Sequence, residues 1–489
     1  MKKTWFELGL LIFIAIAAGV DELQAGTTVI QGVTVIDGTG QPPVAGRFVT
    51  VSEGRISAIG DTLPEDLPAG TLLVDGQGKF MVPGFIDTNV HASEYGNSNR
   101  RETVVKYGGR NHELAEEFAQ LQLKYGVTTI RDSYGSLVPL MQVRDAIERG
   151  EMIGARMLVA GNIVGWGGPF SLTFSLMDES ELTLFQEQWN DRIAQGAGEE
   201  LMDMGPEELR VAINAYLDKE PDFIKYGGTS HFRYPSLIGF SPRAQEVIVE
   251  ETHKRGLVAE THATSSEALR MAVEAGIDFI QHPEILSAPY PDDLVNMIVE
   301  RDVICGLRSN TLTGKPWQIH LQAREKAMKE LATAPAAASS AEERRRADQR
   351  GDQYQLQREN AVRLIKGGCL VTIATDNYQG DAPEFRRAPK DPMQEAGNGS
   401  LLAIEGLVEL GMTPMQAIVA ATRNGAMACK ALNEFGTIEV GKSADLLLLD
   451  ANPLDDISNI RRQSLVMARG RAIDVDALPR QKIFYTGSY

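Results

Sequence analysis

The chain has 489 residues, including 48 Lys or Arg and 66 Asp or Glu, so its formal net charge is −18. This length allows two to four domains, or one large barrel with an appended domain. The 43% hydrophobic and 23% charged fractions are typical of globular proteins and exclude a disordered or fibrous chain. The acidic balance argues against a nucleic acid partner, and three cysteines without a CxxC pair argue against a disulfide framework or a zinc ribbon.

Residues 1–25 have the pattern of a secretory signal peptide. Lys2 and Lys3 precede an apolar run from Leu8 to Ala18 that is too short to cross a bilayer. We therefore expect the mature protein to be secreted or periplasmic, with an uncleaved anchor as the alternative. No later stretch is apolar enough to span a membrane, so no membrane partner is expected after cleavage.

Short β-branched runs bounded by Gly, Asp and Pro occur near both ends of the chain. Such runs predict antiparallel strands. They lie at residues 26–40, 48–60, 70–85, 443–453 and 464–473. Their position predicts one small β-sandwich domain built from both termini, with residues 26–80 as its first part and 435–489 as its second.

The region between them, residues 81–434, alternates apolar strands with amphipathic helices. This alternation predicts a parallel sheet that is buried on both faces, and eight such units predict a (β/α)₈ TIM-like barrel in an α/β fold. The expected strands are 81–91, 127–133, 155–162, 222–228, 256–263, 276–283, 302–310 and 369–377.

Two connections are longer than a barrel needs, at residues 165–220 and 311–358. Both follow strands and therefore emerge on the face where barrel enzymes carry their active sites. The 311–358 insertion is rich in Ala, Arg and Glu. A solvated helical excursion and a lid over the barrel mouth are both compatible with that composition.

Polar residues gather where the expected barrel strands end. His91, His262 and His282 each close a strand, Asp376 closes the eighth, and Lys225 lies inside the fourth. The carboxyl ends of barrel strands converge, so these side chains are expected to face one cavity. Imidazole and carboxylate are ligands of catalytic Zn²⁺ and related divalent ions. A buried lysine needs a partner, which is either Asp376 or CO₂, with which it would form a carbamate.

At this point the chain resembles the amidohydrolase superfamily, and within it the imidazolonepropionase-like branch that includes Xaa-Pro dipeptidases and carboxypeptidases. The motifs that carry this resemblance are PGFIDTNVH, FIKYGG, ETHA, GIDFIQHP, IATDN and GTIEVGKSADLLLLDANPL. The resemblance implies that one or two divalent ions, most simply Zn²⁺, are bound by His91, carboxylated Lys225, His262, His282 and Asp376.

One position departs from that pattern. The family carries His-x-His at the end of strand one, whereas this chain has Asn89 at the first position. An amide oxygen is a weaker ligand than imidazole for a borderline-soft ion. The chain is similar in this respect to phenylurea hydrolases and molinate hydrolase, which cleave carbonyl–nitrogen bonds in urea-type or thiocarbamate compounds. Asn89 is therefore a candidate metal ligand, and the metal position on its side of the site is expected to be under-occupied.

Other residues are weaker candidates. His231, Tyr95 and Arg308 follow barrel strands and are candidate substrate contacts. Arg131 and Asp132 are expected to pair with each other. Trp166 is expected to pack in the interior or to line a pocket.

The resemblance implies a metal-dependent hydrolase that cleaves a carbonyl–nitrogen bond in an amide, urea or carbamate, with Asp376 as the catalytic proton acceptor and donor. The alternatives are an Xaa-Pro dipeptidase or carboxypeptidase, a deaminase, and a non-catalytic relative. The expected partner is a small-molecule substrate, and assembly into a homo-oligomer is left open.

Overall fold

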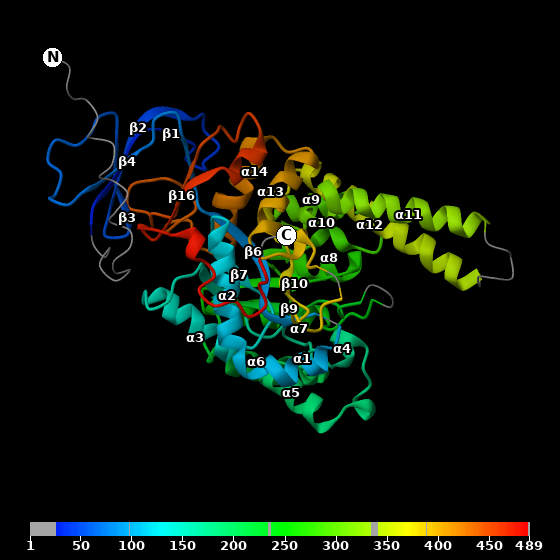
Figure 1. Ribbon diagram of the computed structural model, residues 1–489. Coiled ribbons are helices and arrows are strands. Elements are labelled where there is room, and N and C mark those ends of the chain that lie inside the picture. The colour runs from blue at the N-terminus through cyan, green and yellow to red at the C-terminus, as the bar shows by residue number, and fades with distance from the viewer. Residues whose placement is uncertain (1–25, 97, 233–235, 334–340, 388, 488–489) are drawn as a thin grey trace, which may run out of the picture.

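The computed structural model describes residues 26–96, 98–232, 236–333, 341–387 and 389–487 (Figure 1). The expected signal peptide, residues 1–25, lies outside these ranges. Among the helices in the described ranges, none is long and apolar enough to cross a bilayer.

The strands are β1 Thr28–Val35, β2 Val44–Ser52, β3 Arg55–Gly60, β4 Leu72–Asp75, β5 Phe80–Pro83, β6 Phe85–Tyr95, β7 Val127–Asp132, β8 Arg156–Val159, β9 Phe223–Gly227, β10 Val258–His262, β11 Phe279–Gln281, β12 Ile304–Leu307, β13 Leu370–Ile373, β14 Asn377–Gly380, β15 Leu446–Leu449, β16 Gln463–Ala468 and β17 Arg471–Ala472.

The α-helices are α1 Arg100–Tyr107, α2 Asn111–Lys124, α3 Leu137–Glu148, α4 Leu172–Ser175, α5 Leu184–Ala194, α6 Pro206–Leu217, α7 Pro242–Lys254, α8 Ser266–Glu274, α9 Asp292–Glu300, α10 Ser309–Leu312, α11 Gly314–Thr333, α12 Ala341–Gly367, α13 Asn398–Glu409, α14 Pro414–Val419 and α15 Gly425–Ala428.

Strands from both ends of the chain meet in one eight-stranded sheet. Its order is β17-β16-β15-β5-β1-β2-β3, and β4 pairs with β1. Figure 1 shows the blue N-terminal strands beside the red C-terminal strand β16. The expected β-sandwich is not confirmed, because these strands form a single sheet. Short alternating runs specify strands, but they do not specify whether a second sheet packs against the first.

Strands β6 to β13 overlap the predicted runs, whereas β14 extends beyond the run predicted at 369–377, and together they form two sheets of order β13-β12-β11-β10-β9 and β14-β6-β7-β8. Their neighbouring strands are parallel. A single parallel bridge from Val164 to Tyr226 joins the two sheets beyond β8. On the other side the backbone N–H of Asp376 donates to the carbonyl of Asn89 over 2.9 Å.

The expected closed barrel is therefore not confirmed as one continuous hydrogen-bonded ladder. Two local features interrupt the ladder. Gly161 and Gly165 turn the chain away with positive φ after β8, and Asp376 has a φ of +61° between β13 and β14. As a result β14, rather than β13, pairs with β6.

Helix caps fix the points at which two site strands give way to helices. The Ser241 hydroxyl accepts from the N–H of Ala244 and Pro242 opens α7. Ser265, three residues beyond the end of β10, caps α8 in the same way by accepting from Ala268. Capping satisfies N–H groups that the first turn of a helix leaves free, so the starts of α7 and α8 are fixed.

The two long insertions differ in how they pack against the rest of the molecule. Residues 165–220 contain α4, α5 and α6 and pack against the body of the molecule (Figure 1). The insertion at 311–358 forms most of α11 and α12, a pair of helices that projects away from the body. Its base reaches the strand ends, where Arg308 Nη2 donates to Gln357 Oε1 over 3.3 Å.

A buried carboxylate on α2 anchors the C-terminal segment. Glu117 accepts from the backbone N–H groups of Ile483, Phe484 and Tyr485, at distances of 2.7, 2.9 and 2.9 Å. The Phe484 ring then packs against Tyr107, with the ring centroids 5.0 Å apart. Hydrogen bonds to an ionised acceptor are stronger than neutral ones, so this carboxylate ties the tail to the body.

We expect Glu117→Gln to release this segment. The amide keeps one acceptor oxygen but turns its NH₂ group toward backbone donors, and a lost bond to a charged group costs about 1.5–3 kcal/mol. Hydrogen exchange at residues 483–485 should accelerate about 10–100-fold. Glu116→Gln, one residue away, is the matched control. Equal exchange rates in the two variants would contradict the anchoring role.

Candidate functional site

Asp376 lies at the centre of the predicted site. Its Oδ1 lies 3.0 Å from His91 Nε2 and accepts from Asn89 Nδ2 over 3.2 Å. Its Oδ2 accepts from Arg308 Nη1 over 3.3 Å. Burial acts to raise the pKa of Asp376, but the hydrogen bond with His91 and the neighbouring positive charges outweigh it and hold that pKa well below its usual range. The carboxylate is therefore ionised and surrounded by donors.

Lys225 enters this group through a serine. Its Nζ donates to Ser133 Oγ over 3.0 Å, and the Ser133 hydroxyl donates to Asn89 Oδ1. The Lys225 side chain is buried, and this burial lowers its pKa. Lys225, Ser133, Asn89 and Asp376 thus form one hydrogen-bonded chain across β9, β7, β6 and the turn after β13.

His262 and His282 form a second pair beside this chain. His262 Nδ1 and His282 Nε2 are 3.3 Å apart, and both rings are buried. Burial, with smaller effects from neighbouring charges, lowers both pKa values well below the usual range of histidine, so both imidazoles are neutral. Two neutral imidazoles whose nitrogens face each other are suited to share a cation.

An aromatic wall adjoins the histidine pair. The Trp166 ring lies 4.8 Å from the His262 ring, and Phe174 stacks on His231 at 4.8 Å with the planes 11° apart. Tyr134 stacks on the same phenylalanine at 5.0 Å. The predicted contact residue His231 is thus within reach of the site, and the 165–220 insertion contributes Trp166 and Phe174 to its wall.

Arg308 is held in place by a buried glutamate. Its Nε donates to Glu284 Oε1 over 3.0 Å while Nη1 reaches Asp376. Glu284 is fully buried and lies two residues beyond His282. The guanidinium is therefore fixed between two carboxylates, which favours a role in orienting Asp376.

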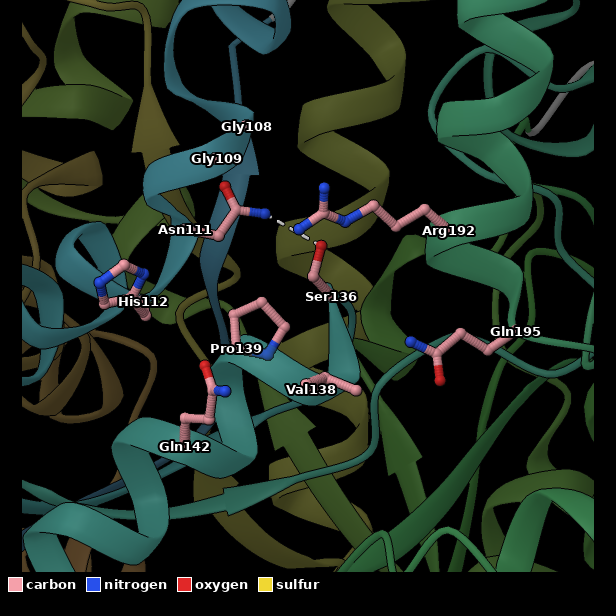
Figure 2. Close-up of a pocket in the computed structure, with 10 residues that line it drawn as sticks. All are labelled: Gly108, Gly109, Asn111, His112, Ser136, Val138, Pro139, Gln142, Arg192 and Gln195. Atoms are coloured by element: carbon pink, nitrogen blue, oxygen red, sulfur yellow. Dashed lines mark hydrogen bonds between the residues drawn. The ribbon is translucent and has the colours of Figure 1, made fainter.

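Tyr95 lies at the end of β6, and its side chain is engaged elsewhere. Its hydroxyl donates to Asn111 Oδ1, and its ring packs near Phe484. Asn111 in turn donates to Ser136 Oγ over 3.0 Å at a separate cavity of about 360 Å³, which Figure 2 shows. Arg192 and His112 also line this cavity. The structure does not bring the Tyr95 hydroxyl to the Asp376 group.

The expected pairing of Arg131 with Asp132 is wrong. Arg131 Nη2 lies 2.9 Å from Glu260 Oε2, and both side chains are buried. Asp132 instead accepts from the N–H of Ala92 over 2.6 Å, and burial raises its pKa to about 7. Successive residues of a strand point to opposite faces, so neighbours in sequence cannot pair within β7.

The sequence reasoning missed Ser133 and Glu284. Ser133 stands directly after β7, so the rule that locates site residues at strand ends would have found it. Glu284 has no comparable signal, because its role depends on where the Arg308 side chain reaches.

Three His, Cys, Asp or Glu side chains do not come together as a metal-ligand group anywhere in the described part of the chain. The candidate donors lie instead as two pairs, His91 with Asp376 and His262 with His282, and Asn89 and Lys225 are linked to the first pair through Asp376 and Ser133.

The sequence comparisons place this chain among known hydrolases. The model of the amidohydrolase family matches residues 80–473. The imidazolonepropionase of Alkaliphilus metalliredigens is 20% identical over 456 residues, covering 87% of this chain and 91% of that protein. The imidazolonepropionase of a Geobacillus species is 36% identical over a shorter stretch that spans 19% of each protein.

Solved structures give the same result over nearly the whole chain. Molinate hydrolase is 30% identical, with a TM-score of 0.82, and the match covers 95% of this chain and 98% of that one. Phenylurea hydrolase B is also 30% identical, with a TM-score of 0.81 and coverage of 95% and 100%. A Xaa-Pro dipeptidase shares the fold at 20% identity, with a TM-score of 0.68 and coverage of 92% and 100%. The predicted resemblance is confirmed: the chain belongs to the amidohydrolase family and is a hydrolase of carbon–nitrogen bonds.

Proposed function

We propose that this chain cleaves the carbonyl–nitrogen bond of a small amide, urea or carbamate, with Asp376 as the proton-transferring group and a divalent cation as cofactor. One observation carries the proposal: an ionised Asp376 lies among His91, Asn89 and Arg308, beside the neutral pair His262 and His282. These side chains supply nitrogen and oxygen donors and a proton acceptor, which are groups that metal-assisted hydrolysis uses.

The donor set fits a cation. The three buried imidazoles each have one ring nitrogen, His91 Nδ1, His262 Nε2 and His282 Nδ1, for which the described residues supply no hydrogen-bond partner. The second ring nitrogen of His91 faces Asp376, and those of His262 and His282 face each other. A cation at these positions would be bound by both members of each pair. We propose that His91, His262, His282 and Asp376 hold it, with Asn89 and carboxylated Lys225 completing the site. Nitrogen and oxygen donors of this kind favour Zn²⁺.

A divalent cation bound here would act as a Lewis acid on the attacking water and on the substrate carbonyl. The protein's own groups move the proton. Asp376 accepts a proton from the attacking water and then delivers it to the departing nitrogen, because an amine leaves poorly unless its nitrogen is protonated. Arg308, held by Glu284, keeps the carboxylate turned toward the reacting atoms, and His231 is a candidate donor to the developing oxyanion.

The aromatic wall and the comparisons together favour ureas and carbamates over dipeptides. Trp166 lies next to His262, and Phe174 and Tyr134 continue this apolar ring surface, which suits a substituent that is aromatic or aliphatic rather than charged. Molinate hydrolase and phenylurea hydrolase B are both 30% identical to this chain, whereas the dipeptidase is 20% identical.

A substrate panel tests this proposal. We expect zinc-loaded protein to release amine from N-phenylureas, thiocarbamates or anilides, with a kcat/KM at least about tenfold above that for Xaa-Pro dipeptides. A protein that hydrolyses the dipeptides faster would show that the dipeptidase alternative is correct. Ammonia release from aminated heterocycles, without cleavage of the ureas, would favour a deaminase.

We further propose that the protein acts after export, with residues 1–25 as its signal peptide. Mass spectrometry of the exported protein should then find a mature N-terminus near Gly26. An intact Met1 would favour the anchor alternative.

A further inference from the structure

The hydrogen-bonded chain from Lys225 to Asp376 has a direction that its two ends determine. Lys225 Nζ donates to Ser133 at one end, and the Asp376 carboxylate accepts from Asn89 at the other. The Ser133 oxygen accepts from Lys225, so its single proton is directed to Asn89 Oδ1. The Asn89 NH₂ group therefore faces Asp376, to which it donates over 3.2 Å.

This direction decides what Asn89 can do. Its Oδ1 is occupied by Ser133, so with a free lysine Asn89 is a donor to Asp376 and its oxygen is turned away from the cation site. Asn89 and Ser133 are fully buried and Lys225 is 1% exposed. Solvent therefore cannot readily supply substitute partners for these groups.

Carboxylation of Lys225 would reverse the chain. The lone pair of the neutral amine attacks the carbon of CO₂, a new N–C bond forms, the electrons of one C–O π bond become a lone pair on a carboxylate oxygen, and one proton passes from the nitrogen to the buffer. No group is oxidised or reduced. The resulting carbamate oxygens only accept hydrogen bonds, so the Ser133 proton would turn to them. The Ser133 oxygen would then accept from the Asn89 NH₂ group, which leaves Asn89 Oδ1 directed toward His91 and Asp376.

We propose that Ser133 is a positioning residue that couples the carboxylation state of Lys225 to the orientation of the Asn89 amide. With free Lys225, Asn89 donates to Asp376. With carboxylated Lys225, the amide oxygen lies beside the Asp376 carboxylate, an arrangement that repels unless a cation lies between them. CO₂ and the divalent cation therefore reinforce each other through Ser133, since coupling between two ligands is reciprocal. This inference rests on the proposed cation site.

The carbamate could also promote cation binding simply as an additional ligand, and the experiment must separate the two routes. Metal-free protein is titrated with Zn²⁺ in CO₂-free buffer and in buffer with ¹³C-bicarbonate. The dissociation constant, the metal stoichiometry and the ¹³C carbamate signal are measured together. The variants are Ser133→Ala, Ser133→Thr, Asn89→Ala and the double variant Ser133→Ala with Asn89→Ala. Ser136→Ala is the control, because Ser136 is a buried serine of the same loop whose hydroxyl accepts from Asn111 instead.

In the wild-type protein and the Ser136→Ala control, bicarbonate should tighten Zn²⁺ binding by about 5–150-fold, the usual range of such coupling. Ser133→Ala should still show the carbamate signal but lose most of this gain, and Asn89→Ala should do the same. The double variant should lose no more than either single variant, since both act on one route. Ser133→Thr, which retains a hydroxyl, should keep the gain.

Two results would overturn the coupling. A full bicarbonate response in Ser133→Ala would show that the carbamate acts only as a ligand. An absent bicarbonate response in the wild-type protein would show that Lys225 is not carboxylated in a way that affects the site. Failure of the wild-type protein to bind a divalent cation in either buffer would also refute the cofactor of the proposed function, and this distinguishes it from the first two results.

Discussion

Replacing Asp376 with asparagine should lower kcat by about 10²–10⁴-fold, the usual contribution of a positioned proton-transfer group. Asparagine has nearly the same shape and keeps an oxygen that can accept from Asn89 or Arg308. It cannot take a proton from water at neutral pH or deliver one to the leaving nitrogen. The structural change is therefore small while the chemical change is large.

The measurement is kcat with the best substrate from the panel, beside the metal content from elemental analysis. Metal content should fall little in Asp376→Asn, because the three histidines remain. His262→Ala should lose metal and rate together. Asp391→Asn is a control for the replacement of a carboxylate by an amide, because Asp391 caps the short helical turn Pro392–Gln394. Near-normal turnover of Asp376→Asn would rule out this residue as the proton-transferring group.

The second large effect concerns stability. Arg131→Ala should lower the free energy of unfolding by about 3–5 kcal/mol, because it leaves the buried Glu260 carboxylate without its charged partner. The guanidinium also lies 3.9 Å above the Phe223 ring and 5.1 Å from the Phe279 ring, so truncation removes packing as well as charge. This ion pair lies among the parallel strands that carry the site.

Chemical denaturation provides the comparison. The double variant Arg131→Met with Glu260→Met should be much closer to the wild-type protein, because it removes both charges and retains volume. Arg149→Ala breaks the exposed pair with Glu151, whose attraction is weakened by solvent, and should leave the free energy of unfolding close to that of the wild-type protein. A loss in Arg131→Ala no larger than that of Arg149→Ala would contradict the structural role of the buried pair.

The sequence predicts the position of the strands and of most strand-end residues because their signals are local. Short runs that open with apolar residues, such as Leu257 to Ala259 before His262, favour a buried parallel strand, and the residue that ends such a strand faces the common cavity. His91, His262, His282, Asp376 and Arg308 are predicted in this way.

The features that the sequence did not predict depend on contacts between elements that are far apart in the chain. Whether strands β1 to β5 stack as a sandwich or form one sheet depends on packing that short alternating runs do not encode. Asp376 departs from the strand geometry with a positive φ, which a non-glycine residue rarely adopts and which no sequence pattern announced. Glu284 holds Arg308 only because the turn after β11 lies next to the end of β12. The pairing of Arg131 with Asp132 could have been excluded from the sequence alone, because successive side chains of a strand point to opposite faces.

The most direct test of the proposed function is the rate of amine release from a phenylurea, measured on one preparation before chelation, after chelation and after Zn²⁺ is restored. The structure places the donor pairs His91 with Asp376 and His262 with His282 at the strand ends, and the proposed function requires a cation held by these side chains. We predict that chelation abolishes amine release and that Zn²⁺ restores it in the wild-type protein but not in His262→Ala. Undiminished amine release by the chelated protein, with its metal shown to be gone, would contradict the account.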